Sequence, residues 1–100
     1  MKHVQISVYI NEADKWQQRP LYLELLSMLH EHEISGGTVL RAVAGFTYTK
    51  SGEISLGDDN SKLPLVVQFI DTIEKIKAVL PVVKAMVGTR LIIRESVEII

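Results

Sequence analysis

The order of apolar patterns along the chain limits its fold more than any other feature. Residues 3–10 alternate apolar with polar side chains, as a strand does when one of its faces is buried. After a polar stretch at 11–19, Pro20 stands where a helix can begin, and leucines then recur every four residues towards Ile34. The glycine pair at 36–37 should end this helix, and we interpret it as a helix cap followed by a tight turn.

The second half of the chain carries two further strand patterns, a helix and a last strand. Residues 38–48 and 63–70 are rich in β-branched and apolar residues, which is typical of strands. A polar segment at 47–61 lies between them, and a loop of this length inside a compact domain is usually functional or mobile. Apolar residues at spacings of three and four then predict a helix that ends near Val87, and residues 90–100 form the last strand.

The second helix has recognisable start, middle and stop signals. Asp71 and Glu74 have the spacing of a capping box, with Asp71 as the N-cap. Pro81 lies inside the helical pattern and should kink or split the helix, because proline removes a backbone donor and crowds the preceding turn. Gly88 ends the element.

Strand, helix, strand, strand, helix, strand is the order of the split βαβ motif. We therefore predict an α+β, ferredoxin-like βαββαβ sandwich, with a four-stranded antiparallel sheet and two helices on one face. One hundred residues suit a single domain spanning 1–100. The N-terminal residues alternate rather than form an apolar run, and no apolar stretch is long enough for a membrane span. We expect a cytoplasmic protein without direct membrane insertion.

The sheet is predicted to be apolar on the face that the helices leave open. Val39 and Val43 oppose the face of Leu40, and residues 63–70 are apolar on both sides apart from Gln68. An apolar patch on one sheet face is typical of an interface. We predict a closed homo-oligomer that covers this face, with a monomer as the alternative.

Composition excludes several functions. The net charge is −1, and few aromatic residues lie near the predicted sheet, so a nucleic-acid partner is not expected. The chain has no cysteine, which excludes disulfides and thiolate chemistry. His30 and His32 are two residues apart on a helix and face different directions, so they do not chelate one metal. No metal site is predicted, and no catalytic set is apparent.

Several stretches of the chain resemble one family over nearly its whole length. They are residues 19–22, 37–46, 63–76 and 95–99, of which 37–46 is the most specific. The chain resembles the PII-like proteins, and most closely the uncharacterised bacterial family of domain of unknown function 190. This resemblance implies a homotrimer with its sheets facing inward, a ligand in the clefts between subunits, and signalling through the 47–61 loop to a target such as a membrane transporter.

The resemblance also directs attention to particular residues. A small anionic ligand such as ATP, ADP or AMP would contact residues near the long loop and on the last strand. The predicted contacts are Gly37, Thr38, Gly45, Phe46, Arg90 and Arg94. The chain departs from PII proteins in lacking their glycine-rich phosphate loop, because only Val87-Gly88-Thr89-Arg90 stands at that point.

The same residues also have purely structural interpretations. Gly45 allows a strand to bend, and Arg90 and Arg94 are ordinary charges at a strand edge. Arg41 is predicted either to pair across subunits, with Glu95 or Glu98, or to bind an anion.

Three functions remain open from the sequence. The leading one is a PII-like sensor that binds its ligand without chemistry. The second is a structural or protein-binding trimer without nucleotide. The third is a small acylphosphatase-like enzyme, for which the sequence contains no recognisable anion loop.

Overall fold

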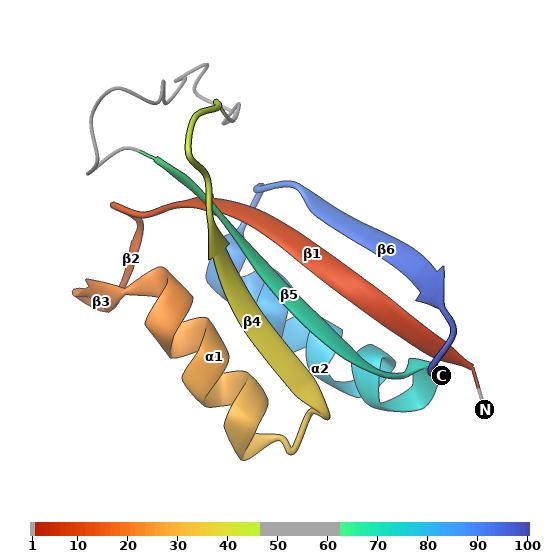
Figure 1. Cartoon of the computed structure of the whole chain (residues 1–100). Helices are drawn as coiled ribbons and strands as arrows, with labels where there is room; N and C mark the ends of the chain where they lie inside the picture. The colour runs from red at the N-terminus through yellow and green to blue at the C-terminus, as the bar shows by residue number, and fades with distance from the viewer. Residues whose placement is uncertain (1, 47–62) are drawn as a thin grey trace.

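The computed structural model describes residues 2–46 and 63–100. Its elements follow one another as β1 (His3–Asn11), β2 (Lys15–Trp16), β3 (Arg19–Pro20), α1 (Leu21–Glu31), β4 (Gly36–Arg41), β5 (Pro64–Thr72), α2 (Ile73–Val87) and β6 (Ile92–Val97). Four strands form an antiparallel sheet in the order β4-β5-β1-β6 (Figure 1). The predicted α+β, ferredoxin-like fold is confirmed.

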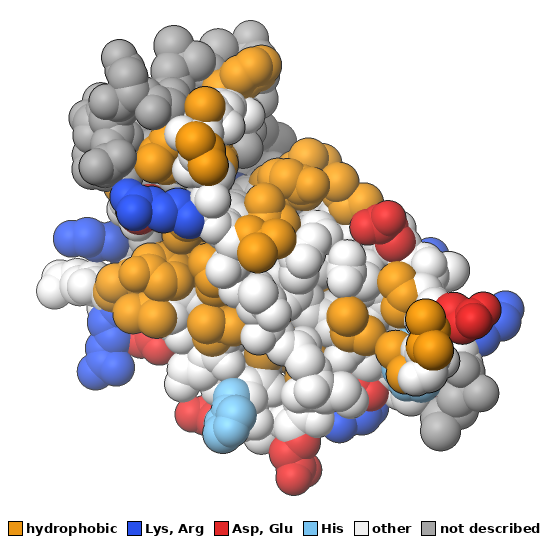
Figure 2. Space-filling view, viewed as in Figure 1, with side chains coloured by type: hydrophobic (Ala, Val, Ile, Leu, Met, Phe, Trp, Pro, Cys, Tyr) orange, Lys and Arg blue, Asp and Glu red, His pale blue; other side chains and the backbone are white. Residues whose placement is uncertain are grey.

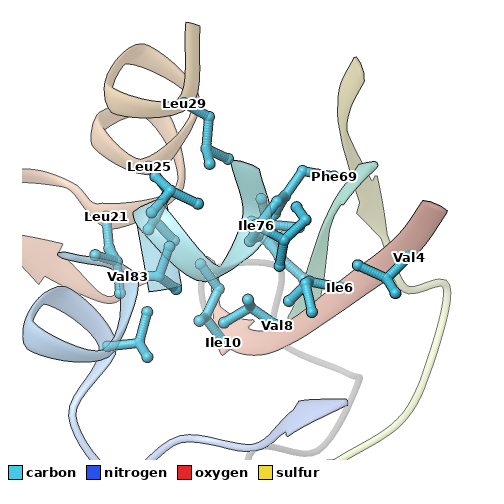
Figure 3. Packing of buried hydrophobic residues seen from close by; sticks show 14 residues of the cluster. Val4, Ile6, Val8, Ile10, Leu21, Leu25, Leu29, Phe69, Ile76 and Val83 are labelled. Atoms are coloured by element: carbon cyan, nitrogen blue, oxygen red, sulfur yellow. The ribbon is translucent and has the colours of Figure 1, made fainter. Parts of the chain in front are cut away.

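The core lies between the two helices and one face of this sheet. The alternation along β1 buries Val4, Ile6, Val8 and Ile10, which lie opposite the inward-facing residues of β5. Each helix contributes one apolar stripe to the same cluster (Figure 3). The stripes are Leu21, Leu25 and Leu29 in α1, and Ile76, Val79, Val83 and Val87 in α2. Both helices therefore cover one face and leave the other open.

The open face of the sheet is partly apolar, but not through the residues predicted for β4. Val39 lies opposite Val67 and packs against the core, whereas Leu40 lies on the open face with 49% of its surface exposed. The assignment of Val39 to the open face was wrong because each face of β4 carries one large apolar residue, Val39 or Leu40. Only pairing with β5 fixes which face turns inward.

Apolar residues from every strand of the sheet share the open face with Leu40. The registers place Tyr9, Val66, Ile70, Ile93 and Val97 there. Between them, the Gln68 amide donates a hydrogen bond of 3.4 Å to the Ser7 hydroxyl. In Figure 2, hydrophobic side chains gather over β6 and over the stretch that follows β4, with polar atoms between them.

Helix α1 ends earlier than its apolar pattern suggested, and the glycine pair has another role. Glu33 adopts a left-handed φ of 57°, while the Glu33 and Ile34 amides donate to His30 and Leu29. This is the Schellman arrangement, with glutamate where glycine is usual. The interpretation of Gly36 and Gly37 as cap and turn was therefore wrong, because both are extended residues of β4.

The polar stretch at 11–19 contains a small hairpin that the sequence did not predict. Lys15 pairs with Pro20, and Trp16 with Arg19, through a turn whose two central glutamines have positive φ. Such two-residue turns match the twist of paired strands. Pro20 is consequently the N-cap of α1 rather than its first residue.

Helix α2 begins one residue later than the capping box required. Thr72 is its N-cap, and its hydroxyl accepts from the Lys75 amide at 3.4 Å. Asp71 instead ends the inward-facing row of β5 and is buried. Pro81 does not split the helix, which runs as one element from Ile73 to Val87.

Strand β4 is shorter than the predicted 38–48. It ends at Arg41, although the Ala42 amide still donates to the Pro64 carbonyl at 3.0 Å. Pro64 is the first residue of β5, so β5 has no further residue with which an extension of β4 could pair. The predicted loop at 47–61 lies outside the described residues. No helix within 2–46 and 63–100 is long and apolar enough to cross a membrane.

Candidate functional site

The six predicted ligand contacts divide between the two edges of the sheet. β4 forms one edge and carries Gly37 and Thr38, and the chain after it carries Gly45 and Phe46. β6 forms the other edge and carries Arg94, while Arg90 precedes it. A single chain therefore does not bring the six residues together.

The register shows how far apart the two groups lie. Gly37 pairs with Phe69, Phe69 with Ile6, and Ile6 with Arg94, so these residues form one row across the sheet. Neighbouring strands are about 4.8 Å apart, which places the backbones of Gly37 and Arg94 roughly 14 Å from each other. The two groups of predicted contacts therefore do not meet at one point within a single chain.

Gly37 lies where β4 approaches α1. A Cβ at this position would lie 3.4 Å from Leu26 Cδ2, at the limit of ordinary contact. Gly37 also lines a pocket of about 290 Å³ with Gly36, Ser35 and His30. The pocket and the exposed Thr38 leave this edge accessible to a ligand, while close packing of α1 explains the glycine without one.

Gly45 and Phe46 lie at the opposite end of β4. Gly45 has a φ of 150°, a conformation that favours glycine, and its position faces the ring of Pro64. Phe46 leaves 61% of its surface exposed. Phe46 thus presents an apolar ring to solvent at the end of the described segment 2–46.

Arg90 is held by contacts within the chain. Its Nε donates to Asp14 Oδ2 at 2.8 Å, and its Nη1 donates to the Val87 carbonyl at 2.8 Å. The same Asp14 oxygen accepts from the Asn11 amide at 2.9 Å. Arg90 therefore joins the end of β1 to the last turn of α2, and its charge is largely compensated.

Arg41 also has a carboxylate partner in its own chain. Its guanidinium forms a fork on Glu12, with Nε 2.9 Å from Oε2 and Nη2 3.1 Å from Oε1. The register ends β4 beside the loop that follows β1, which carries Glu12. The alternative pairing with Glu95 or Glu98 concerns a neighbouring subunit and stays a prediction.

Asp71 is the one ionisable group among the described residues whose pKa clearly departs from its ordinary value, and its sequence position had predicted only a capping role. Its Oδ2 accepts from the Ser35 amide at 2.9 Å and the Ser35 hydroxyl at 3.0 Å, and lies 3.3 Å from Lys75 Nζ. Its Oδ1 accepts from the Thr72 amide at 2.6 Å. The Lys75 ammonium also donates to the Glu33 carbonyl.

These contacts set the charge state of Asp71. Burial alone would raise the pKa of its carboxyl, but the hydrogen bonds from Thr72, Ser35 and Lys75 outweigh burial and lower the pKa from 3.8 to about 2. The carboxylate joins the α1–β4 connection to the start of α2, and so positions Gly36 and Gly37. A signal was available in the sequence, because Asp71 continues the i, i+2 row of Leu65, Val67 and Phe69.

The described residues contain no cluster of His, Asp and Glu suited to a metal ion. His30 and His32 are exposed and belong to no such cluster of three or more residues in 2–46 or 63–100. The predicted contacts offer backbone, an exposed aromatic ring and guanidinium groups.

The sequence and fold have clear relatives. A sequence model of the family described as "DUF190: Uncharacterized ACR, COG1993" matches residues 3–99. A UPF0166 protein of Aquifex aeolicus is 36% identical over 96 residues, covering 95% of this chain and 90% of the relative. The expected similarity to that family is confirmed.

Two solved structures share the fold at low sequence identity. The periplasmic divalent cation tolerance protein CutA from Archaeoglobus fulgidus has a TM-score of 0.65 and 17% identity, over 97% of this chain and 85% of CutA. CPII from Thiomonas intermedia K12, bound to ADP and bicarbonate, has a TM-score of 0.64 and 11% identity, over 99% and 89% of the two chains. At these identities the similarity establishes the fold alone.

Proposed function

The chain belongs to the DUF190 family and has the PII-like fold, and from this premise we propose that it is an oligomeric PII-like binding protein. In this proposal it forms a homotrimer that holds a small anionic ligand in the clefts between subunits. An adenine nucleotide, ATP, ADP or AMP, is the ligand we propose. Binding in the cytoplasm shifts the conformation of the 47–61 loop, which then contacts a target such as a membrane transporter.

The observation that carries this proposal is the separation of the predicted contacts onto opposite edges of the sheet. A ring of identical chains brings one edge of each chain against the other edge of its neighbour. The β4 edge of one subunit, with Gly37 and Thr38, then lies near the β6 edge of the next, with Arg94. In this proposal the ligand site is shared between two chains.

The open sheet face supplies the reason for assembly. Leu40 and Ile93 leave 49% and 37% of their surfaces exposed there, with Val66 and Ile70 beside them. Removing this apolar area from water contributes about 25 cal/mol per Å². The hydrogen-bonded Ser7 and Gln68 pair at the centre gives the face a polar contact that can fix its orientation.

A thermal-shift series with ATP, ADP, AMP and adenosine tests the function. A ligand that binds only the folded state raises the melting temperature with its concentration. We expect at least one nucleotide to act and adenosine to have little effect, since the proposed contacts recognise an anion. Failure of all three nucleotides at millimolar concentration contradicts nucleotide binding.

One observation favours a second candidate, a protein-binding trimer without nucleotide. Arg90, one of the two arginines among the predicted contacts, is already neutralised by Asp14. An arginine held in this way stabilises the subunit whether or not a ligand is present. The candidates separate when the trimer persists while no nucleotide changes its melting temperature.

A further inference from the structure

A pocket of about 270 Å³ lies at the end of the sheet away from residues 45 and 46. The pairs of β1 identify the two ends of the sheet. His3 pairs with Thr72 and Val97 at the end that carries the pocket, and Asn11 pairs with Pro64 at the other end. The polar residues that line the pocket are Lys2, His3, Arg94 and Ser96. Val4 and Ile73 are among its apolar walls.

Arg94 differs from every other arginine of the chain. Arg19, Arg41 and Arg90 each lie within 4 Å of a carboxylate, provided by Glu24, Glu12 and Asp14. Within residues 2–46 and 63–100, Arg94 has no such carboxylate and no side-chain hydrogen bond. Among the four arginines, Arg94 is therefore the one whose charge no carboxylate of the described residues neutralises.

The position of Arg94 in the sheet explains why it faces this pocket. It lies opposite Ile6 on the side of β6 that the helices cover, and Ser96 lies two residues along the same side, opposite Val4. Glu95, between them, lies opposite Gln5 on the open face. The alternation of the strand thus separates the acid from the two donors.

The charges around the pocket have one sign. Lys2 and Arg94 are cations at neutral pH, while the alternation of β1 turns the His3 side chain towards the open face. No Asp or Glu is among the described residues that line the pocket. The nearest buried acid of β5, Asp71, is already bound to Ser35, Thr72 and Lys75. A forked guanidinium, an ammonium and a hydroxyl are the donors that recognise phosphate oxygens.

We propose that Arg94, Lys2 and Ser96 form a binding site for a phosphate group. The pocket is smaller than most sites for drug-sized ligands, so it suits the phosphate group itself or the phosphate end of a larger molecule. The chain lacks the glycine-rich phosphate loop between α2 and β6. The side chains of this pocket would supply the hydrogen-bond donors to phosphate at a different place in the fold. The site can serve the nucleotide proposed above, but it does not require that ligand.

Nuclear magnetic resonance on the ¹⁵N-labelled full chain tests the site. Inorganic phosphate is titrated in a phosphate-free buffer at constant ionic strength, and the Arg94 Nε–H and Ser96 amide signals are followed. We expect a saturable shift of both signals. In Arg94→Gln the dissociation constant should rise roughly tenfold or more, because a charge-assisted hydrogen-bond pair is lost.

Arg19→Gln is the matched control, since it removes the same charge from an exposed side chain far along the sequence. Its phosphate affinity should stay within about twofold of that of the parent chain, as expected when a surface charge acts only through a screened field. Equal weakening in both variants, or a response that never saturates, overturns the proposal. Circular dichroism spectra must match among the three proteins.

Titrations with ADP and adenosine separate the sources of the phosphate group, and they distinguish failure of this site from failure of the proposed nucleotide cleft, which also includes Arg94. Shifts at Arg94 from phosphate alone support the pocket even when ADP does not bind. Shifts from ADP but not adenosine support a pocket that takes the phosphate end of a nucleotide. If ADP shifts only signals of Phe46 and Arg90 while phosphate shifts nothing, the nucleotide proposal survives and the pocket is overturned.

Discussion

Replacing Asp71 by asparagine should destabilise the fold, and the size of the effect follows from its pKa. The carboxyl pKa falls from 3.8 to about 2 in the folded chain. At 1.36 kcal/mol per pKa unit this is about 2 kcal/mol of stability at neutral pH. The Asp71 side chain is only 4% exposed, so solvent does little to screen the interaction.

Asparagine is a poor substitute at this position because its amide nitrogen cannot accept hydrogen bonds. The two carboxylate oxygens now accept hydrogen bonds from the Ser35 amide, the Ser35 hydroxyl and the Thr72 amide. In asparagine, an NH₂ group that only donates would replace one of these oxygens. We therefore expect Asp71→Asn to lower the free energy of unfolding by about 2 kcal/mol at pH 7, the scale of a lost charged hydrogen bond.

The pH dependence gives the sharper test. Because the folded pKa lies below the unfolded one, the unfolded chain takes up the proton first as pH falls. The contribution of Asp71 is complete above about pH 4 and disappears as pH falls towards 2. The parent chain and Asp71→Asn should therefore differ at pH 7 and converge in stability between about pH 4 and pH 2.

Urea unfolding at one fixed protein concentration measures this difference, since assembly makes stability depend on concentration. Glu74→Gln is the control, because Glu74 lies in the first turn of the same helix and its loss should cost about 0.5 kcal/mol. Equal stability of Asp71→Asn and the parent at pH 7, or curves that stay parallel down to about pH 2, would refute the reasoning.

Three further predictions concern the sheet edges and the open face. Gly37→Ala places a methyl group 3.4 Å from Leu26 Cδ2 on extended backbone. The free energy of unfolding measured in urea should therefore change by no more than about 0.5 kcal/mol, and a larger loss would mean that α1 cannot adjust. Arg90→Ala should lower the free energy of unfolding by about 1–2 kcal/mol in the same assay. In a double-mutant cycle, the effect of Arg90→Ala should be much smaller when Asp14 is already replaced by asparagine. Leu40→Lys charges the open face and should reduce the mass found by light scattering while leaving the circular dichroism spectrum intact; an unchanged mass locates the interface elsewhere.

The sequence predicted the fold well because its periodicities are regular. The alternation in residues 3–10 and the leucine spacing in 21–29 correspond to β1 and α1, and the stripe that ends at Val87 corresponds to α2. Each of these segments has one apolar face, so the pattern alone determines which side is buried.

The errors occurred where local signals compete with pairing. Each face of β4 carries one large apolar residue, so the register with β5, rather than alternation, decides that Val39 is inside and Leu40 outside. Glu33 takes the left-handed position that glycine usually occupies, which frees Gly36 and Gly37 for the strand.

The candidate site was less predictable than the fold for a physical reason. Asp14 and Glu12 are distant in sequence from Arg90 and Arg41, so their ion pairs arise only from the tertiary structure. Arg94 could be named from its position on the last strand, but its lack of a carboxylate partner within the described residues emerges only from the folded geometry.

Native mass spectrometry of the purified chain with ADP tests the central claim most directly, because it reports assembly and ligand together. The account predicts a trimer of 11.2 kDa chains that carries up to one ADP per chain, with ADP absent from any monomer. A protein that remains monomeric at micromolar concentration, or a trimer that takes up no ADP, would contradict the claim that the ligand site is built between subunits.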